Sequence, residues 1–127
     1  MSKKLLIGSF TIIILGYFLI ASKGTPQSVT AAKTSIWLEI QNINSAQCEP
    51  VEIDKLWFVV CKSKSNSDNK AVFWIDSLES NSNNVQYVVY NVNGKSKQYA
   101  DRFKDLQTVD LYDDGSHPKV MTAFKKI

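Results

Sequence analysis

The chain opens with an uninterrupted apolar run. Residues 5–21 carry no charged side chain, and Lys3 and Lys4 precede them. At about 1.5 Å rise per residue, a helix of this length spans about 26 Å, the short end of a bilayer crossing. We therefore expect residues 1–23 to be an uncleaved membrane anchor, with its bilayer contacts made by Leu5, Ile12, Ile13, Ile14, Leu15, Phe18 and Leu19.

A cleaved signal peptide is the alternative for this segment. Its apolar core is normally about 7–15 residues long and is followed closely by a small-x-small site. The best such site is residues 29–31, ten residues beyond the run, so retention is favoured. Residues 24–29 contain two helix breakers, Gly24 and Pro26, with mostly polar residues around them, which predicts a linker. Because the lysine pair should stay in the cytoplasm, we expect residues 30–127 to be exported as one domain.

The hydrophobic pattern after the linker has a helical period. Ser28 or Thr30 is a candidate N-cap, and alanines follow. Three residues then recur at i, i+4 and i+7, which is typical of an amphipathic helix: Ile36, Ile40 and Ile43. Trp37 lies beside this stripe, and we expect it to pack on a sheet as a core residue.

Residues 48–61 contain the only two cysteines of the chain. Strand-forming residues dominate this stretch. A two-residue turn at Asp54 and Lys55 makes every opposing pair of residue numbers sum to 109, so Cys48 faces Cys61. The pair then occupies a non-hydrogen-bonded position, where Cα atoms are about 4.5 Å apart, close enough for a disulfide. Because Asp-Lys is a poor turn dipeptide, a looser reversal between residues 49 and 55 is the alternative.

Two further stretches alternate as strands do. Residues 71–79 place apolar side chains on both faces, and residues 85–92 alternate in the same way. Asn93 and Gly94 follow directly and form the strongest short turn signal in the chain. They predict a hairpin whose short, basic return strand covers residues 95–100.

The remainder of the chain predicts only short elements. Residues 101–107 indicate one or two helical turns, residues 108–112 a strand, and residues 119–124 a last strand or a short helix. A helix followed by four to six strands predicts the α+β class, with the N-terminal helix packed on a curved antiparallel sheet.

The charge balance changes the picture once it is divided by region. Three of the 15 basic residues flank the apolar run, and the first acidic residue is Glu39. From residue 24 onward 12 basic residues therefore face 12 acidic ones. A neutral domain excludes a nucleic-acid-binding role, which needs a basic face.

The compartment decides what the two cysteines do. In an exported chain a pair of cysteines indicates a disulfide, and the spacing of Cys48 and Cys61 fits no zinc pattern. Closing a loop of this length contributes about 3 kcal/mol in the chain-entropy model. We expect a structural bridge.

Candidate chemistry is sparse. The single histidine, His117, lies in a turn and is expected at the surface, and no nucleophile, carboxylate pair or metal cluster is recognisable. We therefore predict no catalytic residue, cofactor or metal. Four tyrosines either contact a partner or cover the core with wet hydroxyls: Tyr87, Tyr90, Tyr99 and Tyr112.

These patterns favour a non-enzymatic, single-pass inner-membrane protein of bacteria. Its periplasmic domain is expected to be a structural or accessory interaction module in a secretion, conjugation or pilus assembly, with other envelope proteins as partners and residues 5–21 in the bilayer. One alternative is a periplasmic inhibitor, exclusion or immunity protein. Another is a cleaved, soluble periplasmic or secreted binding module.

Overall fold

The computed structural model describes residues 24–65, 69–78, 86–111 and 116–127. Three helices and five strands occur within them, in the order α2 (Gln27–Gln41), β1 (Ala46–Ile53), β2 (Leu56–Ser63), β3 (Lys70–Ser77), β4 (Tyr87–Asn91), α3 (Gly94–Ala100), β5 (Val109–Asp110) and α4 (Pro118–Phe124). The predicted anchor lies outside the described residues. Within those ranges, no helix has the length and apolarity to cross a bilayer.

The strands form one open sheet in sequence order, β1-β2-β3-β4-β5. The first four pair antiparallel, as predicted, whereas β5 pairs parallel to β4. The sheet is therefore mixed, because residues 101–108 lead back along α3 before β5 joins the edge. The predicted α+β class, with a helix packed on a sheet, is confirmed.

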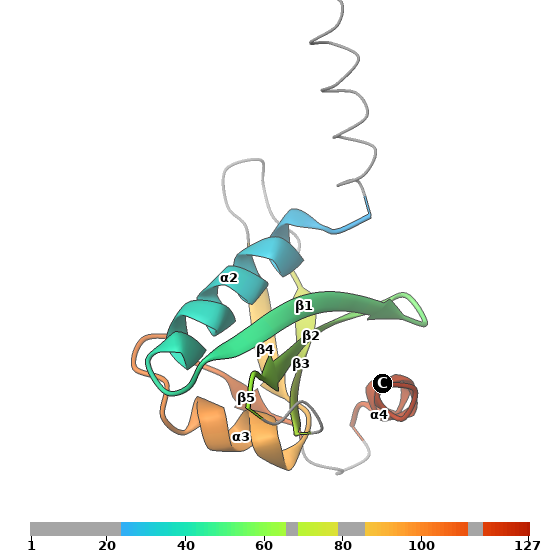
Figure 1. Ribbon diagram of the computed structural model, residues 1–127. Coiled ribbons are helices and arrows are strands. Elements are labelled where there is room, and N and C mark those ends of the chain that lie inside the picture. Colours follow the sequence, from blue (N-terminus) through green and yellow to red (C-terminus); the bar gives the residue numbers. More distant parts are fainter. Residues whose placement is uncertain (1–23, 66–68, 79–85, 112–115) are drawn as a thin grey trace, which may run out of the picture.

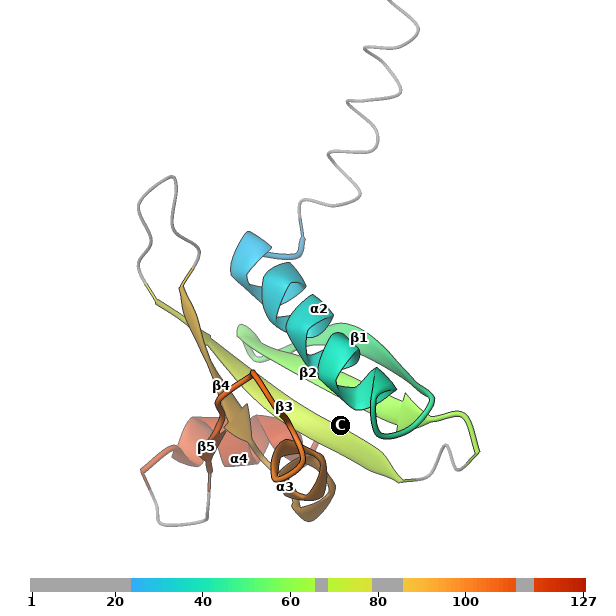
Figure 2. The same cartoon turned by 90° about the vertical axis from the view of Figure 1, so that its left-hand side faces the viewer.

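Both faces of the central strands are buried. On one face Val59, Cys61, Phe73 and Ile75 pack against α2, whose buried apolar residues are Val29, Ala32, Ile36 and Ile40. On the other face Phe58, Val60, Val72 and Trp74 pack against Val120 and Ala123 of α4. The sheet is thus a middle layer with α2 on one side and α4 on the other (Figures 1 and 2). The segment 119–124, predicted as strand or helix, supplies this second cover.

Helix α2 begins earlier than the sequence indicated. Pro26 occupies the N-cap position with φ −59°, and its carbonyl accepts hydrogen bonds from the backbone N–H groups of Val29 and Thr30. Neither Ser28 nor Thr30 caps the helix, because both already lie inside it. The predicted linker 24–29 therefore ends at Pro26, where the missing N–H of proline costs no hydrogen bond.

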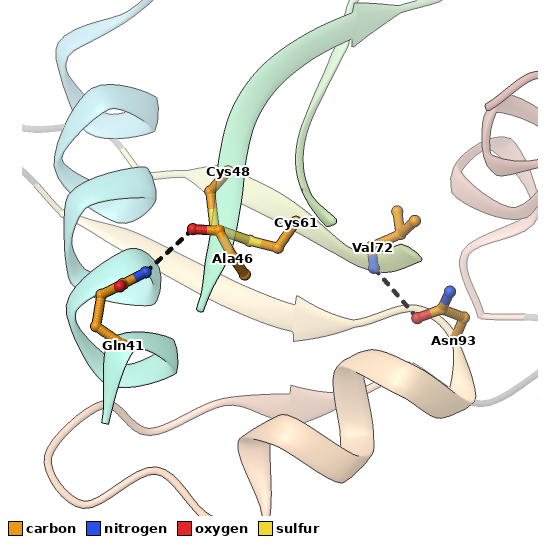
Figure 3. The surroundings of a disulfide bond; sticks show 6 residues. All are labelled: Gln41, Ala46, Cys48, Cys61, Val72 and Asn93. Atoms are coloured by element: carbon orange, nitrogen blue, oxygen red, sulfur yellow. Dashed lines mark hydrogen bonds between the residues drawn. A yellow bond between two sulfur atoms is a disulfide. The ribbon is translucent and has the colours of Figure 1, made fainter. Parts of the chain in front are cut away.

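The predicted hairpin at Asn93 and Gly94 is wrong, and residues 95–100 are helical. Asn93 is extended (φ −125°, ψ 174°) and caps α3: its side chain accepts from the Ser96 N–H, and the Ser96 hydroxyl accepts from the Asn93 N–H. The same side chain also joins β3: it accepts from the Val72 N–H (Figure 3) and donates to the Lys70 carbonyl. A type I′ turn needs positive φ at both central residues. Asn93 instead has a negative φ, because it caps α3 and does not form a turn.

Asn93→Ala should cost about 2–3 kcal/mol of unfolding free energy, because it removes a helix cap and two bonds to β3. Gly94→Ala is the matched control. A Cβ at Gly94 meets no atom within 4 Å, so its effect should stay within about 1 kcal/mol. Urea denaturation measures both. A larger loss for Gly94→Ala than for Asn93→Ala would contradict the capping role.

Candidate functional site

Within the described residues, the first strand, β1, pairs with β2 alone and forms one edge of the sheet. Cys48 faces Cys61 with a Cα–Cα distance of 4.0 Å, the close spacing of a non-hydrogen-bonded pair. Residues at such positions turn their backbone groups away from the paired strand. Because the pattern alternates, Cys48, Pro50 and Glu52 all point their backbone groups to the free edge. The edge therefore offers three C=O groups but only two N–H groups, since proline has none.

Both ends of this free edge are closed. At one end Gln41 of α2 donates its Nε2–H to the Ala46 carbonyl at 3.1 Å (Figure 3). At the other end Asp54 and Lys55 make the predicted two-residue turn, with φ values of 53° and 66°. The open part of the edge thus runs from Cys48 to Glu52.

A groove of about 500 Å³ lies between this edge and α2. Its walls are formed by Lys33, Thr34 and Trp37 from the helix and by Gln47, Cys48 and Glu49 from the strand. Trp37 is 39 % exposed, so its prediction as a core residue is wrong. It follows Ile36 by one residue, about 100° around the helix. This turns its ring from the core toward β1.

The Cys48–Cys61 disulfide is present, as predicted, and joins β1 to β2 (Figure 3). Cys48 is also one of the residues that line the groove. Both cysteines are buried. The whole hairpin has the predicted register, from Ile53 opposite Leu56 outward. The covalent link holds the edge strand on the sheet, so the free backbone groups keep a fixed position.

Removing the bridge, by reduction or by the double change Cys48→Ala/Cys61→Ala, should lower the unfolding free energy by about 3 kcal/mol. Guanidinium denaturation of oxidised, reduced and substituted protein measures this. Equal stability of the oxidised and reduced forms would show that the bridge adds nothing to the fold.

A second hollow, of about 280 Å³, lies on the other flank of α2 and includes Glu39. The Glu39 carboxylate accepts backbone N–H bonds from Lys104 at 3.2 Å, Asp105 at 2.8 Å and Leu106 at 2.6 Å. Burial raises the pKa of Glu39, but these three donors and the Lys104 charge lower it by more, so the pKa lies below its ordinary value. The carboxylate thus holds the backbone of residues 104–106. Residues 101–107 do not form the predicted helical turns.

Glu39→Gln should destabilise the fold by about 1–3 kcal/mol, because an amide is a weaker acceptor for three N–H groups. The lowered pKa sets the sign of the pH effect. The stabilisation by Glu39 is complete above the pKa of an unfolded glutamate, about 4.3, and is lost as the pH falls through the folded value. Urea titrations at neutral and acidic pH measure this, with Glu49→Gln on exposed β1 as control. A Glu39→Gln deficit that does not shrink on acidification would contradict the assignment.

Within the described residues, the tyrosines and the histidine that the sequence offered as candidate surface residues pack against other parts of the fold. Tyr99 is buried, and Tyr87 shares a 3.0 Å hydrogen bond with Ser35 of α2. Tyr90 stacks on Trp74 at 4.6 Å between ring centroids, and His117 lies 5.2 and 5.4 Å from these two rings. These tyrosines therefore cover the core. Tyr112 lies outside the described residues, and among the described ones no three His, Cys, Asp or Glu side chains gather as a metal site.

Comparison with known proteins found no matching family model, no matching curated protein and no matching solved structure. A functional conclusion must therefore come from the chain itself. Its two distinctive surface features lie side by side. They are the free edge Cys48–Glu52 and the groove with Trp37 on its wall.

Proposed function

We propose that this chain is a non-enzymatic protein-interaction module, exported and tethered to a membrane, that binds a neighbour through the β1 edge and the adjoining groove. The observation that carries the proposal is the free edge, held in place by the disulfide. Exposed strand edges recruit partners by strand addition, in which backbone groups give affinity and neighbouring pockets give specificity.

The location rests on two chemical arguments. Disulfides persist in oxidising compartments, which favours a periplasmic position for the domain that contains Cys48 and Cys61. Lys3 and Lys4 precede the apolar run 5–21, which favours a cytoplasmic N-terminus. Because α2 starts at Gln27, few residues separate the run from the domain. The groove would then lie close to the bilayer, where membrane subunits present their exported segments.

A binding role is supported by how the polar groups are used. The Glu39 carboxylate is occupied by three backbone N–H groups, and His117 packs against two aromatic rings. Trp37, by contrast, is an exposed aromatic side chain beside open backbone groups. Tryptophan is enriched among the residues that dominate protein interfaces. A structural or accessory subunit of a bacterial secretion, conjugation or pilus assembly fits these features.

The location is tested on the full chain made in a bacterial host. A reporter that is active only outside the cytosol, fused at the C-terminus, should be active. Intact-mass measurement should give a retained N-terminus and a mass two protons below that of the dithiol. A reporter active only in the cytosol, or two thiols that alkylate without reduction, would overturn the exported tether.

The binding surface is tested by two neighbouring substitutions on α2. Trp37→Ala should reduce co-purification with membrane neighbours in mild detergent by about tenfold or more, as expected for an interface hot spot. Leu38→Ala is the matched control, because Leu38 is 55 % exposed but faces away from the groove. Both variants should keep the wild-type melting temperature. Equal capture by the two variants would reject the groove as the binding surface.

A further inference from the structure

We propose that the β1 edge takes up an extended, basic polypeptide segment as an antiparallel sixth strand, and that this segment follows the pattern basic-x-x-basic-apolar from its N-terminus. The inference rests on the proposed interaction function and assigns the chemistry of the partner. It follows from three properties of the open edge: its backbone groups, its charges and the wall beside it.

The backbone groups set the length of the segment. Cys48, Pro50 and Glu52 offer three acceptors and two donors, with the proline in the middle lacking an N–H. Gln41 already occupies the Ala46 carbonyl, so pairing cannot extend past Cys48 on that side. The five residues 48–52 cover about 17 Å of strand. The partner therefore needs about five residues in extended conformation.

The side chains on the two faces of β1 set the composition. Cys48, Pro50 and Glu52 share the α2 face, while Gln47, Glu49 and Val51 share the α4 face. Glu49 and Glu52 are both exposed. A sixth strand would place one residue directly across from each glutamate, at about 4.5–5.5 Å between Cβ atoms. Opposite charge is favoured at that distance, so both positions call for lysine or arginine.

The wall of the groove sets the remaining position. A partner residue opposite Cys48 lies on the α2 face, beside Trp37 and Lys33. The indole offers apolar contact, and the lysine disfavours a second cation there. An apolar residue is therefore expected opposite Cys48, and in an antiparallel segment it comes after the basic residues opposite Glu52 and Glu49.

A second copy of this chain is a poorer occupant of the edge. In a two-fold antiparallel pairing centred on Pro50, opposing residue numbers sum to 100, so Glu49 would face Val51 of the other copy and Glu52 would face Cys48. Neither glutamate would gain an opposite charge, and the two Glu49 side chains would become diagonal neighbours about 7–8 Å apart. In the same pairing, the two prolines would also face each other without an N–H to donate. The edge is thus protected against its own copy while remaining open to a basic segment.

The test uses the full chain in zwitterionic detergent and a fluorescent seven-residue peptide, threonine-lysine-threonine-threonine-lysine-valine-threonine. Fluorescence anisotropy should give saturable binding, about tenfold weaker or more when both lysines are replaced by glutamate. Amide hydrogen exchange locates the contact. The outward N–H groups of Cys48 and Glu52 should gain protection, whereas those of Glu49 and Val51, which already bond to β2, should not change.

Variants of the edge separate charge from backbone pairing. Glu49→Lys/Glu52→Lys should exchange the preference, so that the glutamate peptide binds more tightly than the lysine peptide. Glu52→Pro should weaken binding more than Glu52→Gln, because both remove the charge but only proline removes the outward N–H. Thermal denaturation verifies that each variant folds.

Three results would overturn the inference: no binding of the lysine peptide, equal binding of both peptides, or protection that appears away from Cys48 and Glu52. Pairing of two copies through β1 in sedimentation experiments would also overturn it. If the lysine peptide does not bind while capture of a membrane neighbour still depends on Trp37, only the proposed addition of a basic strand to β1 is rejected. If that capture is lost as well, the interaction function itself is rejected.

Discussion

The structure depends on one constraint, that β2 and β3 must be buried on both faces. Phe58 and Val60 point to α4 while Val59 and Cys61 point to α2, so a single helix on one face would leave half of this apolar surface in water. Each fully buried residue of this size contributes about 1.5–3 kcal/mol, which a small domain cannot forgo. The position of α4, the closure of both layers and the choice of β1 as the outer strand all follow from meeting this requirement.

The same constraint explains what could be predicted from the sequence. Uninterrupted apolar runs in β2 and β3 are typical of strands buried on both sides, although the predicted architecture used only one covering helix. The β1–β2 register followed from counting alone, because the disulfide and the strand alternation must agree at every pair. The turn itself was the weak point, since Asp54 and Lys55 adopt positive φ without the usual glycine.

What could not be predicted depended on partners distant in sequence. Asn93 and Gly94 carry the residues of a hairpin turn, but Ser96 and the free backbone of β3 give the asparagine better hydrogen bonds as a cap. Glu39 lies at the border of the apolar stripe of α2, and its three N–H donors come from residues 104–106. No local sequence pattern predicts that Trp37 lies on the groove wall or that Gln41 binds the Ala46 carbonyl at the end of the edge.

The features of β1 that favour a basic partner are also those by which sheets avoid unwanted pairing. Proline and exposed charges at an edge strand block association with other edges. Protection alone, however, does not require an exposed indole beside the strand, nor a disulfide that fixes the edge instead of letting it fray. Trp37 exposes apolar surface to water at a place where a sixth strand on β1 would cover it. An edge strand that was only protected against pairing would need no apolar side chain beside it. β1 disfavours pairing with a second copy of the chain and also has the Trp37 side chain available for contact, and this combination favours selective binding of a different partner.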